Sequence, residues 1–173
     1  MVAIDPVAMK REVAEQLGTS TASVNSALQR ARKAIDSARP TQQAVLRDLG
    51  DAAVADIVTR WTDAWQAGDV DAIVAMLAAD ARYSMPPLPQ WYRGQDEIRA
   101  FLREGPLQSR WRFLPATANS QLAFGTYLWE DAADAYVPGG LDVLTLREGH
   151  VAEVVAFLSA DFTRFGLPAR LRP

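Results

Sequence analysis

The stretch WTDAWQAGDVDAI, residues 61–73, carries the strongest structural signal in this sequence. Its two tryptophans stand four residues apart, so both rings lie on one face of a helix, and Gly68 is a residue type that commonly ends a helix. Asp69 follows as an N-cap whose carboxylate can accept a backbone N–H, and it begins a second helix that we expect to reach Ala78. The stretch therefore predicts two helices joined by a tight turn.

A long helical segment precedes this stretch. Apolar residues recur at helical spacing from Thr41 to Ala67, and they include Val45, Leu46, Leu49, Val54, Ile57 and Val58. Gly50-Asp51 is expected to divide the segment into a linker helix and a helix of the main domain.

Strand patterns dominate the sequence that follows. A run of prolines at 86–89 stops the first strand, a helix is expected over 95–103, and Glu148-Gly149 predicts a hairpin turn. The aromatic and leucine residues near the end, Phe162, Phe165 and Leu167, are expected to pack on the outside of the sheet. Helices followed by an antiparallel sheet predict an α+β fold. The expected strands cover residues 80–85, 110–116, 122–130, 141–147 and 151–158.

Composition excludes several classes of chemistry. The chain has 173 residues, no cysteine and a single histidine, His150, so disulfides, thiolate metal sites and multi-histidine metal sites are excluded. No Gly-rich phosphate-binding loop or calcium loop occurs, and no apolar run approaches the roughly 18–20 residues of a membrane span. We therefore expect no metal, no cofactor, no membrane contact and a cytoplasmic location.

The first 40 residues differ from the rest in charge. They hold six basic and four acidic side chains, whereas the remaining residues hold 12 and 17. Two helices are predicted here, over 6–17 and 22–35, joined by a turn that contains Gly18. The second helix exposes residue types that can meet phosphates and base edges, although a plain helical hairpin with a solvated face has the same pattern. These candidate DNA-binding residues are Ser23, Asn25, Ser26, Gln29, Arg30, Arg32 and Lys33.

The segments EVAEQLGTS (12–20) and VNSALQRARKAI (24–35) resemble the end of region 4 of a sigma-70-type, extracytoplasmic-function (ECF) RNA polymerase sigma factor. That region is the helix-turn-helix that reads the −35 promoter element. The resemblance implies promoter DNA and RNA polymerase as partners, in the context of a complete sigma factor. The rest of region 4 and all of region 2 have no counterpart, so we expect either a C-terminal piece of a sigma factor or a truncated descendant.

Residues 51–173 resemble the SnoaL-like branch of the ketosteroid-isomerase-like cone fold, through WxxAWQAGDVDAI and the strands at 80–86, 141–146 and 151–158. The string MPPLPQWYRG (85–94), with FGLP (165–168), resembles the subfamily that is fused to sigma factors. The resemblance implies a curved antiparallel sheet wrapped around helices. The expected organisation is a partial sigma region 4 helix-turn-helix over 1–36, a linker with a helix over 37–50, and a SnoaL-like domain over 51–173.

A cone of this kind encloses a pocket that suits a small apolar or aromatic ligand. The candidate lining residues could instead simply fill the core. They are Trp61, Trp65, Tyr83, Met85, Trp91, Tyr92, Trp129, Tyr136 and Phe157.

The ketosteroid-isomerase pattern is only partly matched. Its general-base aspartate falls at Met85 and its oxyanion-hole tyrosine at Trp61, whereas its oxyanion-hole aspartate is matched by Asp142. Asp142 is thus the candidate catalytic residue, either facing an apolar interior with a raised pKa or facing outward as an ionised partner of an arginine. Because the base is missing, the sequence favours ligand binding or regulation over catalysis.

Three functions remain open at this point. The first is a regulatory, small-molecule-binding domain of a sigma factor that acts in transcription initiation. The second is a small isomerase, cyclase or epoxide-hydrolase-like enzyme acting on an apolar carbonyl or cyclic substrate, and the third is a structural module that docks a protein. The sheet has apolar residues on both faces, so its outer face needs a cover, either from this chain or from a second copy in a homodimer.

Overall fold

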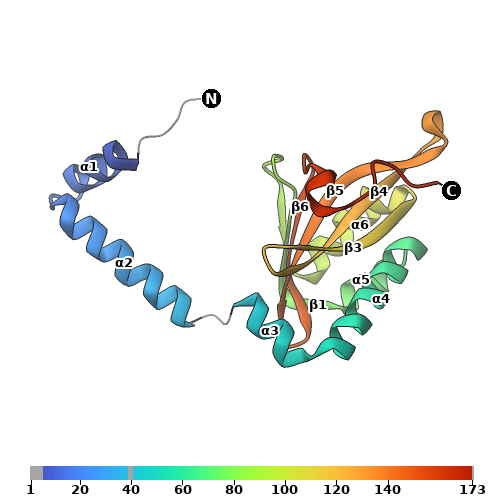
Figure 1. The fold of residues 1–173 in the computed structure, drawn as a ribbon, viewed down its shortest axis with the longest axis horizontal. Coiled ribbons are helices and arrows are strands. Elements are labelled where there is room, and N and C mark those ends of the chain that lie inside the picture. Colours follow the sequence, from blue (N-terminus) through green and yellow to red (C-terminus); the bar gives the residue numbers. More distant parts are fainter. Residues whose placement is uncertain (1–5, 39–40, 173) are drawn as a thin grey trace. The chain divides into compact units, whose positions relative to one another are not determined.

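The computed structural model describes residues 6–38 and 41–172, which fall into two compact units divided between Thr41 and Gln42 (Figure 1). The first unit holds two helices, α1 (Pro6–Gln16) and α2 (Thr21–Ala38). The side chains of residues 6–8 and 32–38 lie outside the described set. Both helices stand where the sequence predicts them, and α2 extends three residues beyond the expected end.

A tight turn joins α1 to α2. Gly18 adopts a φ of +60°, which glycine accepts without strain, and the Ser20 hydroxyl accepts a hydrogen bond from the backbone N–H of Ser23 at 3.1 Å. Ala14 and Val24 are buried, one on each of the two contacting helices. The first unit is therefore an ordered helix pair with a capped second helix.

The second unit opens with three helices, α3 (Gln42–Leu49), α4 (Asp51–Ala67) and α5 (Val70–Ala75). Gly68 ends α4 in the left-handed conformation, and the Asp69 carboxylate caps α5 by accepting the Ala72 N–H at 3.0 Å. The expectation that this helix reaches Ala78 is wrong. Leu77 already lies in a strand, because the preceding Met76 carbonyl accepts the N–H of Val151.

A further α-helix and short 3₁₀ turns follow along the chain. They are α6 (Gln95–Glu104), η1 (Pro106–Gln108), η2 (Asp131–Ala133) and η3 (Phe162–Phe165).

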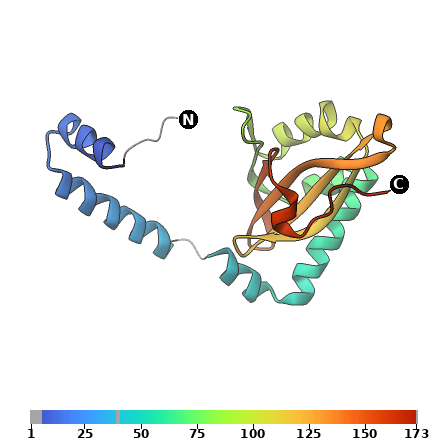
Figure 2. The ribbon, with the colours of Figure 1, turned by 45° about the horizontal axis from the view of Figure 1, so that its top comes forward.

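The six strands form one curved sheet in the order β2-β1-β6-β5-β4-β3 (Figure 2). Five of the six strands lie where strands are expected. The short β2 is not among the predicted strands, because three residues after a proline run give too little pattern. The strands are β1 (Leu77–Ser84), β2 (Trp91–Arg93), β3 (Trp111–Ala118), β4 (Gln121–Glu130), β5 (Ala135–Arg147) and β6 (His150–Phe157).

The sheet is mixed, which corrects the purely antiparallel expectation. Strands β1 and β6 run parallel, with Tyr83 opposite Val154, while the other neighbouring pairs are antiparallel. Sequence alternation carries no information on strand direction. Because β1 and β6 are far apart in sequence, no hairpin requires them to be antiparallel.

The two faces of the sheet bury separate clusters. Helices α4, α5 and α6 cover the inner face, where Trp61, Phe124 and Leu144 are completely buried (Figures 1 and 2). The C-terminal segment with η3 covers part of the outer face, where Phe162 and Leu167 are buried in a second cluster. This chain therefore supplies at least part of the cover that the outer face needs.

Candidate functional site

A small apolar cavity of about 60 Å³ lies on the inner face of the sheet. Tyr83, Thr126 and Asp142 bring hydroxyl and carboxyl groups to its lining, and the Thr126 hydroxyl is already used in a 2.9 Å hydrogen bond to the Gly140 carbonyl. The cavity is lined by Trp65, Tyr83, Met85, Pro106, Trp111, Phe113, Thr126, Gly139, Asp142, Ala156 and Leu158.

Asp142 lies on β5 facing this cavity and is 2% exposed. The Tyr83 hydroxyl donates to its Oδ2 at 3.5 Å, and no arginine pairs with it among the described residues. Of the two orientations left open by the sequence, the structure therefore has the inward one.

Burial sets the protonation of this pair. It raises the pKa of Asp142 to about 7, against a smaller opposing effect of the Tyr83 hydrogen bond. Burial, and then the negative charge of Asp142, raise the pKa of Tyr83 well above its usual range. Near neutral pH a substantial fraction of Asp142 is protonated, so its carboxyl group can donate a hydrogen bond into the cavity.

The indole N–H groups of Trp61 and Trp65 have no hydrogen-bond partner among the described residues, although both side chains are buried. Trp65 lines the cavity, whereas Trp61 packs against Trp65 and Phe124 in the core. An unpaired buried donor is costly, so an acceptor next to Trp65 would be stabilising. The sequence predicts Trp65 as a lining residue, but only the packing of its neighbours leaves its N–H without a partner.

The structure brings three of the nine expected lining residues to the cavity: Trp65, Tyr83 and Met85. Trp61 is completely buried core, so its assignment to the pocket lining is wrong. A tryptophan at helical spacing can either line a pocket or fill the core. Only the packing of the sheet against α4 distinguishes these two roles.

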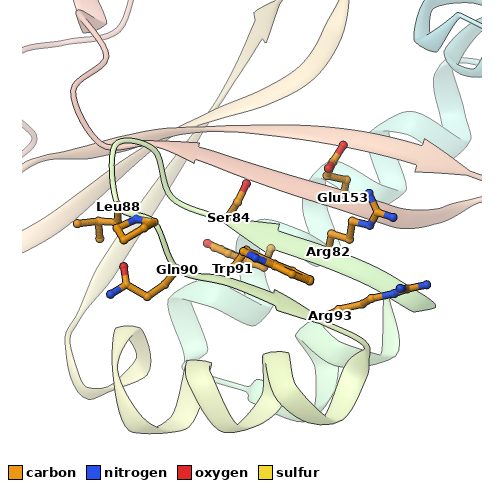
Figure 3. Close-up of a pocket in the computed structure, with 9 residues that line it drawn as sticks. Arg82, Ser84, Leu88, Gln90, Trp91, Arg93 and Glu153 are labelled. Carbon is orange, nitrogen blue, oxygen red and sulfur yellow. The ribbon is translucent and has the colours of Figure 1, made fainter. Parts of the chain in front are cut away.

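The assignment of Trp91 and Tyr92 to this pocket is also wrong. Tyr92 stacks on Phe101 of α6 with ring centroids 4.2 Å apart, outside the cavity lining. Trp91, its neighbour in β2, points to the opposite side of the sheet and is 63% exposed. It lines a separate hollow on the outer side of β1 and β2 (Figure 3).

Trp129, Tyr136 and Phe157 likewise belong elsewhere. Trp129 and Tyr136 meet edge to face at 5.0 Å in the outer-face cluster, with the Arg110 guanidinium 4.4 Å from the Trp129 ring. Phe157 is 41% exposed and lines an outer-face hollow. Their positions in the strands put these side chains on the face away from the cavity, and the register of β4, β5 and β6 determines that face.

The candidate DNA-binding residues lie on α2. Their side chains are exposed at Ser23, Asn25, Ser26, Gln29 and Arg30, and the Ser23 hydroxyl also contacts that of Ser20 at 3.0 Å. The side chains of Arg32 and Lys33 lie outside the described residues. Asn25 and Gln29 stand four residues apart, so they share one face of the helix, as do Ser26 and Arg30.

Two classes of site are not found within residues 6–38 and 41–172. No group of three or more His, Cys, Asp or Glu residues there could hold a metal ion. No helix of that part of the chain has both the length and the hydropathy needed to cross a membrane.

A curved mixed sheet that encloses an aspartate-lined cavity against helices defines a cone-type domain. Residues 58–154 match the SnoaL-like domain family, and the chain belongs to it. A SnoaL-like protein of unknown function from Burkholderia thailandensis E264 matches with a TM-score of 0.52 at 19% identity, over 64% of this chain and 98% of that one. An NTF-2 like protein of unknown function from Burkholderia xenovorans LB400 matches with a TM-score of 0.55 at 16% identity, over 66% and 88%.

Two curated relatives carry sigma-factor names. The ECF RNA polymerase sigma factor SigG of Mycobacterium tuberculosis H37Rv is 37% identical over 164 residues, which cover 92% of this chain and 44% of SigG. The ECF sigma factor SigJ of the same organism is 34% identical over 97 residues, or 53% of this chain and 30% of SigJ. The chain thus spans less than half the length of the relatives it matches.

Proposed function

We propose that this chain is the regulatory, SnoaL-like part of an ECF sigma factor and acts in the cytoplasm on transcription initiation. One observation carries the proposal. A match over 92% of the chain has to cross the boundary between Thr41 and Gln42, so the helix pair and the SnoaL-like unit both resemble a single sigma factor. The proposed partners are promoter DNA and RNA polymerase, in the context of the complete sigma factor.

In this proposal the helix pair is the end of a promoter-reading helix-turn-helix. The exposed side chains of Asn25, Gln29 and Arg30 have the chemistry to contact base edges and phosphates in a major groove. The short Gly18 turn and the Ser20 cap fix the start of α2, the helix that would make this contact.

The SnoaL-like unit is proposed to modulate that activity by binding a small ligand. The inner cavity of about 60 Å³ holds about two water molecules, whereas ligand pockets usually span roughly 300–1,000 Å³. In this proposal a carbonyl or phenol oxygen of the ligand accepts hydrogen bonds from the Trp65 N–H and the protonated Asp142 carboxyl, two residues of the cavity lining. The rest of a ligand requires the cavity walls near Met85 and Leu158 to move outward.

An enzyme is the second candidate, and one observation favours it. The protonated Asp142 carboxyl, held by the Tyr83 hydroxyl, places a hydrogen-bond donor in an apolar cavity, which is a way to stabilise an oxyanion. However, the thioether of Met85 lines the cavity where a general base would be needed, and a thioether cannot take up a proton. The regulatory proposal requires no base.

A chimera tests the proposal. This chain replaces the matching portion of M. tuberculosis SigG, and the product is assayed for core polymerase binding and for run-off transcription from a SigG-dependent promoter. We expect a functional chimera whose transcription falls at least about tenfold in the Asn25→Ala/Arg30→Ala variant, since each base or phosphate contact contributes on the order of 1 kcal/mol or more. Arg60→Ala, on the exposed side of α4, is the matched control. A chimera that neither binds core polymerase nor initiates would overturn the proposal.

A further inference from the structure

A second hollow, of about 420 Å³, lies on the outer side of β1, β2 and β6 (Figure 3). It is separated from the inner cavity by β1, whose alternation sends Tyr83 inward and Arg82 and Ser84 outward. Its volume lies within the range of small-molecule pockets, unlike that of the inner cavity. The hollow is lined by Arg82, Tyr83, Ser84, Leu88, Pro89, Gln90, Trp91, Arg93 and Glu153.

Two arginines form one end of this hollow. Arg82 and Arg93 stand directly opposite each other on the paired strands β1 and β2, and Figure 3 shows both side chains at the same end. Within the described residues neither makes an ion pair with a carboxylate, whereas Arg60, Arg99 and Arg147 each do. Two adjacent guanidinium groups that make no direct ion pair are an anion-binding arrangement, although the carboxylates of Glu153 and Asp80 lie near them.

Glu153 limits the charge that this end can accept. It stands opposite Arg82 on β6, so the lining side chains carry a net charge of about +1. A single negative charge balances that value, whereas a phosphate dianion would remain in excess beside the Glu153 carboxylate. The charge therefore favours a carboxylate over a phosphate group.

Trp91 supplies an uncovered aromatic surface in the middle of the hollow (Figure 3). It is 63% exposed, and it is the tryptophan of this chain whose ring meets no other ring or guanidinium within the described residues. An exposed indole lacks the favourable free energy of burying its apolar surface unless a partner covers it. Leu88 and Pro89 provide an apolar wall at the far end.

We propose that this hollow binds a small planar aromatic carboxylic acid. The aromatic ring stacks on the indole of Trp91, the carboxylate bonds the guanidinium groups of Arg82 and Arg93, and the polar groups of Ser84 and Gln90 flank the ring. Tyr83 is the one residue that lines both this hollow and the Asp142 cavity. The site goes beyond the proposed function, because binding here requires neither DNA nor RNA polymerase.

The test follows the indole N–H signal of Trp91 by two-dimensional ¹H–¹⁵N NMR on the full chain, assigned through Trp91→Phe. The probes are benzoate, the uncharged benzamide, the non-aromatic cyclohexanecarboxylate, and phenyl phosphate. We expect benzoate to shift the signal with a Kd of about 1–10 mM, as suits a ligand of nine heavy atoms. The other three probes are expected to bind at least about threefold more weakly.

Variants assign the binding to the arginine pair. Arg82→Ala/Arg93→Ala should weaken benzoate binding at least about tenfold, whereas Arg60→Ala/Arg164→Ala removes the same charge elsewhere and should leave it unchanged. Asp142→Asn should also leave it unchanged. The proposal is overturned if benzoate does not shift the Trp91 signal at 50 mM, on the order of ten times that Kd. It is equally overturned if benzamide or phenyl phosphate binds as well as benzoate, or if the double variant binds like the wild type.

Discussion

The side-chain amide of Gln42 hydrogen-bonds both backbone groups of Leu146. Its Nε2 donates to the Leu146 carbonyl at 3.0 Å, and its Oε1 accepts the Leu146 N–H at 2.7 Å. The register between β5 and β6 shifts between Thr145 and Leu146, so the amide takes the place of a neighbouring strand at this irregularity. Gln42 is also the first residue of α3, and the contact therefore fixes the start of the second unit to its sheet.

Gln42→Ala should lower the free energy of unfolding of the second unit by about 1–3 kcal/mol, because two half-buried backbone groups lose their partner. The matched control is Gln43→Ala in the same helix, where the side chain is exposed. Urea denaturation followed by fluorescence measures both. Equal stability of the two variants would contradict a structural role for this contact.

Asp142→Asn should remove a pH dependence of stability. In the unfolded chain Asp142 ionises near its ordinary pKa of 3.8, whereas in the folded chain its pKa is about 7. Between these values the unfolded state binds fewer protons, so the stability of the wild type falls as the pH rises from about 4 to 7 and then levels off. Relative to the Asn variant, the free energy of unfolding of the wild type should fall by on the order of 4 kcal/mol or less over this pH range.

Urea midpoints of both proteins between pH 4 and pH 8 check this, with the difference between the two isolating Asp142 from other titrating groups. Tyr83→Phe is the companion variant, because the lost hydrogen bond should raise the pKa of Asp142 further. A constant difference between wild type and Asn variant across this range would show that Asp142 titrates normally.

Gly125→Ala should destabilise the contact between the sheet and the C-terminal segment. A Cβ at Gly125 would lie 2.5 Å from Cδ1 and 3.2 Å from Cγ of Leu167, so the leucine has to move. We expect a cost of about 1–3 kcal/mol. In a Leu167→Ala background the same substitution should cost much less, and a double-mutant cycle of unfolding free energies measures that coupling. Additive effects of the two substitutions on the free energy of unfolding would contradict a direct contact between Gly125 and Leu167.

Binding of the chain to DNA should be weak and steeply salt-dependent, because phosphate contacts from α2 dominate. Fluorescence anisotropy with promoter-like and scrambled duplexes at low and moderate salt measures it. Arg30→Ala should weaken binding to both duplexes and reduce the salt slope by about one, whereas Arg60→Ala should change neither. Tight, sequence-selective binding by this chain alone would show that the helix pair is a stronger reader than proposed.

Local sequence determined most of the secondary structure. Gly50, Gly68 and the Asp69 cap set the helix boundaries, because backbone conformation and capping depend on a few adjacent residues. The pattern also indicated an α+β fold. The WxxAWQAGDVDAI motif and the strands at 80–86, 141–146 and 151–158 were enough for the SnoaL-like resemblance that the family match confirms.

Tertiary structure alone decided which side chains meet. Trp61 and Trp65 look alike in sequence, yet only Trp65 reaches the cavity, and Trp91 and Tyr92 are neighbours that face opposite sides of β2. The parallel pairing of β1 with β6 brings Glu153 opposite Arg82, and no local pattern encodes that long-range pairing. Alternation gives two faces to every strand, but strand order and register, set by packing across the whole sheet, determine which face becomes a site.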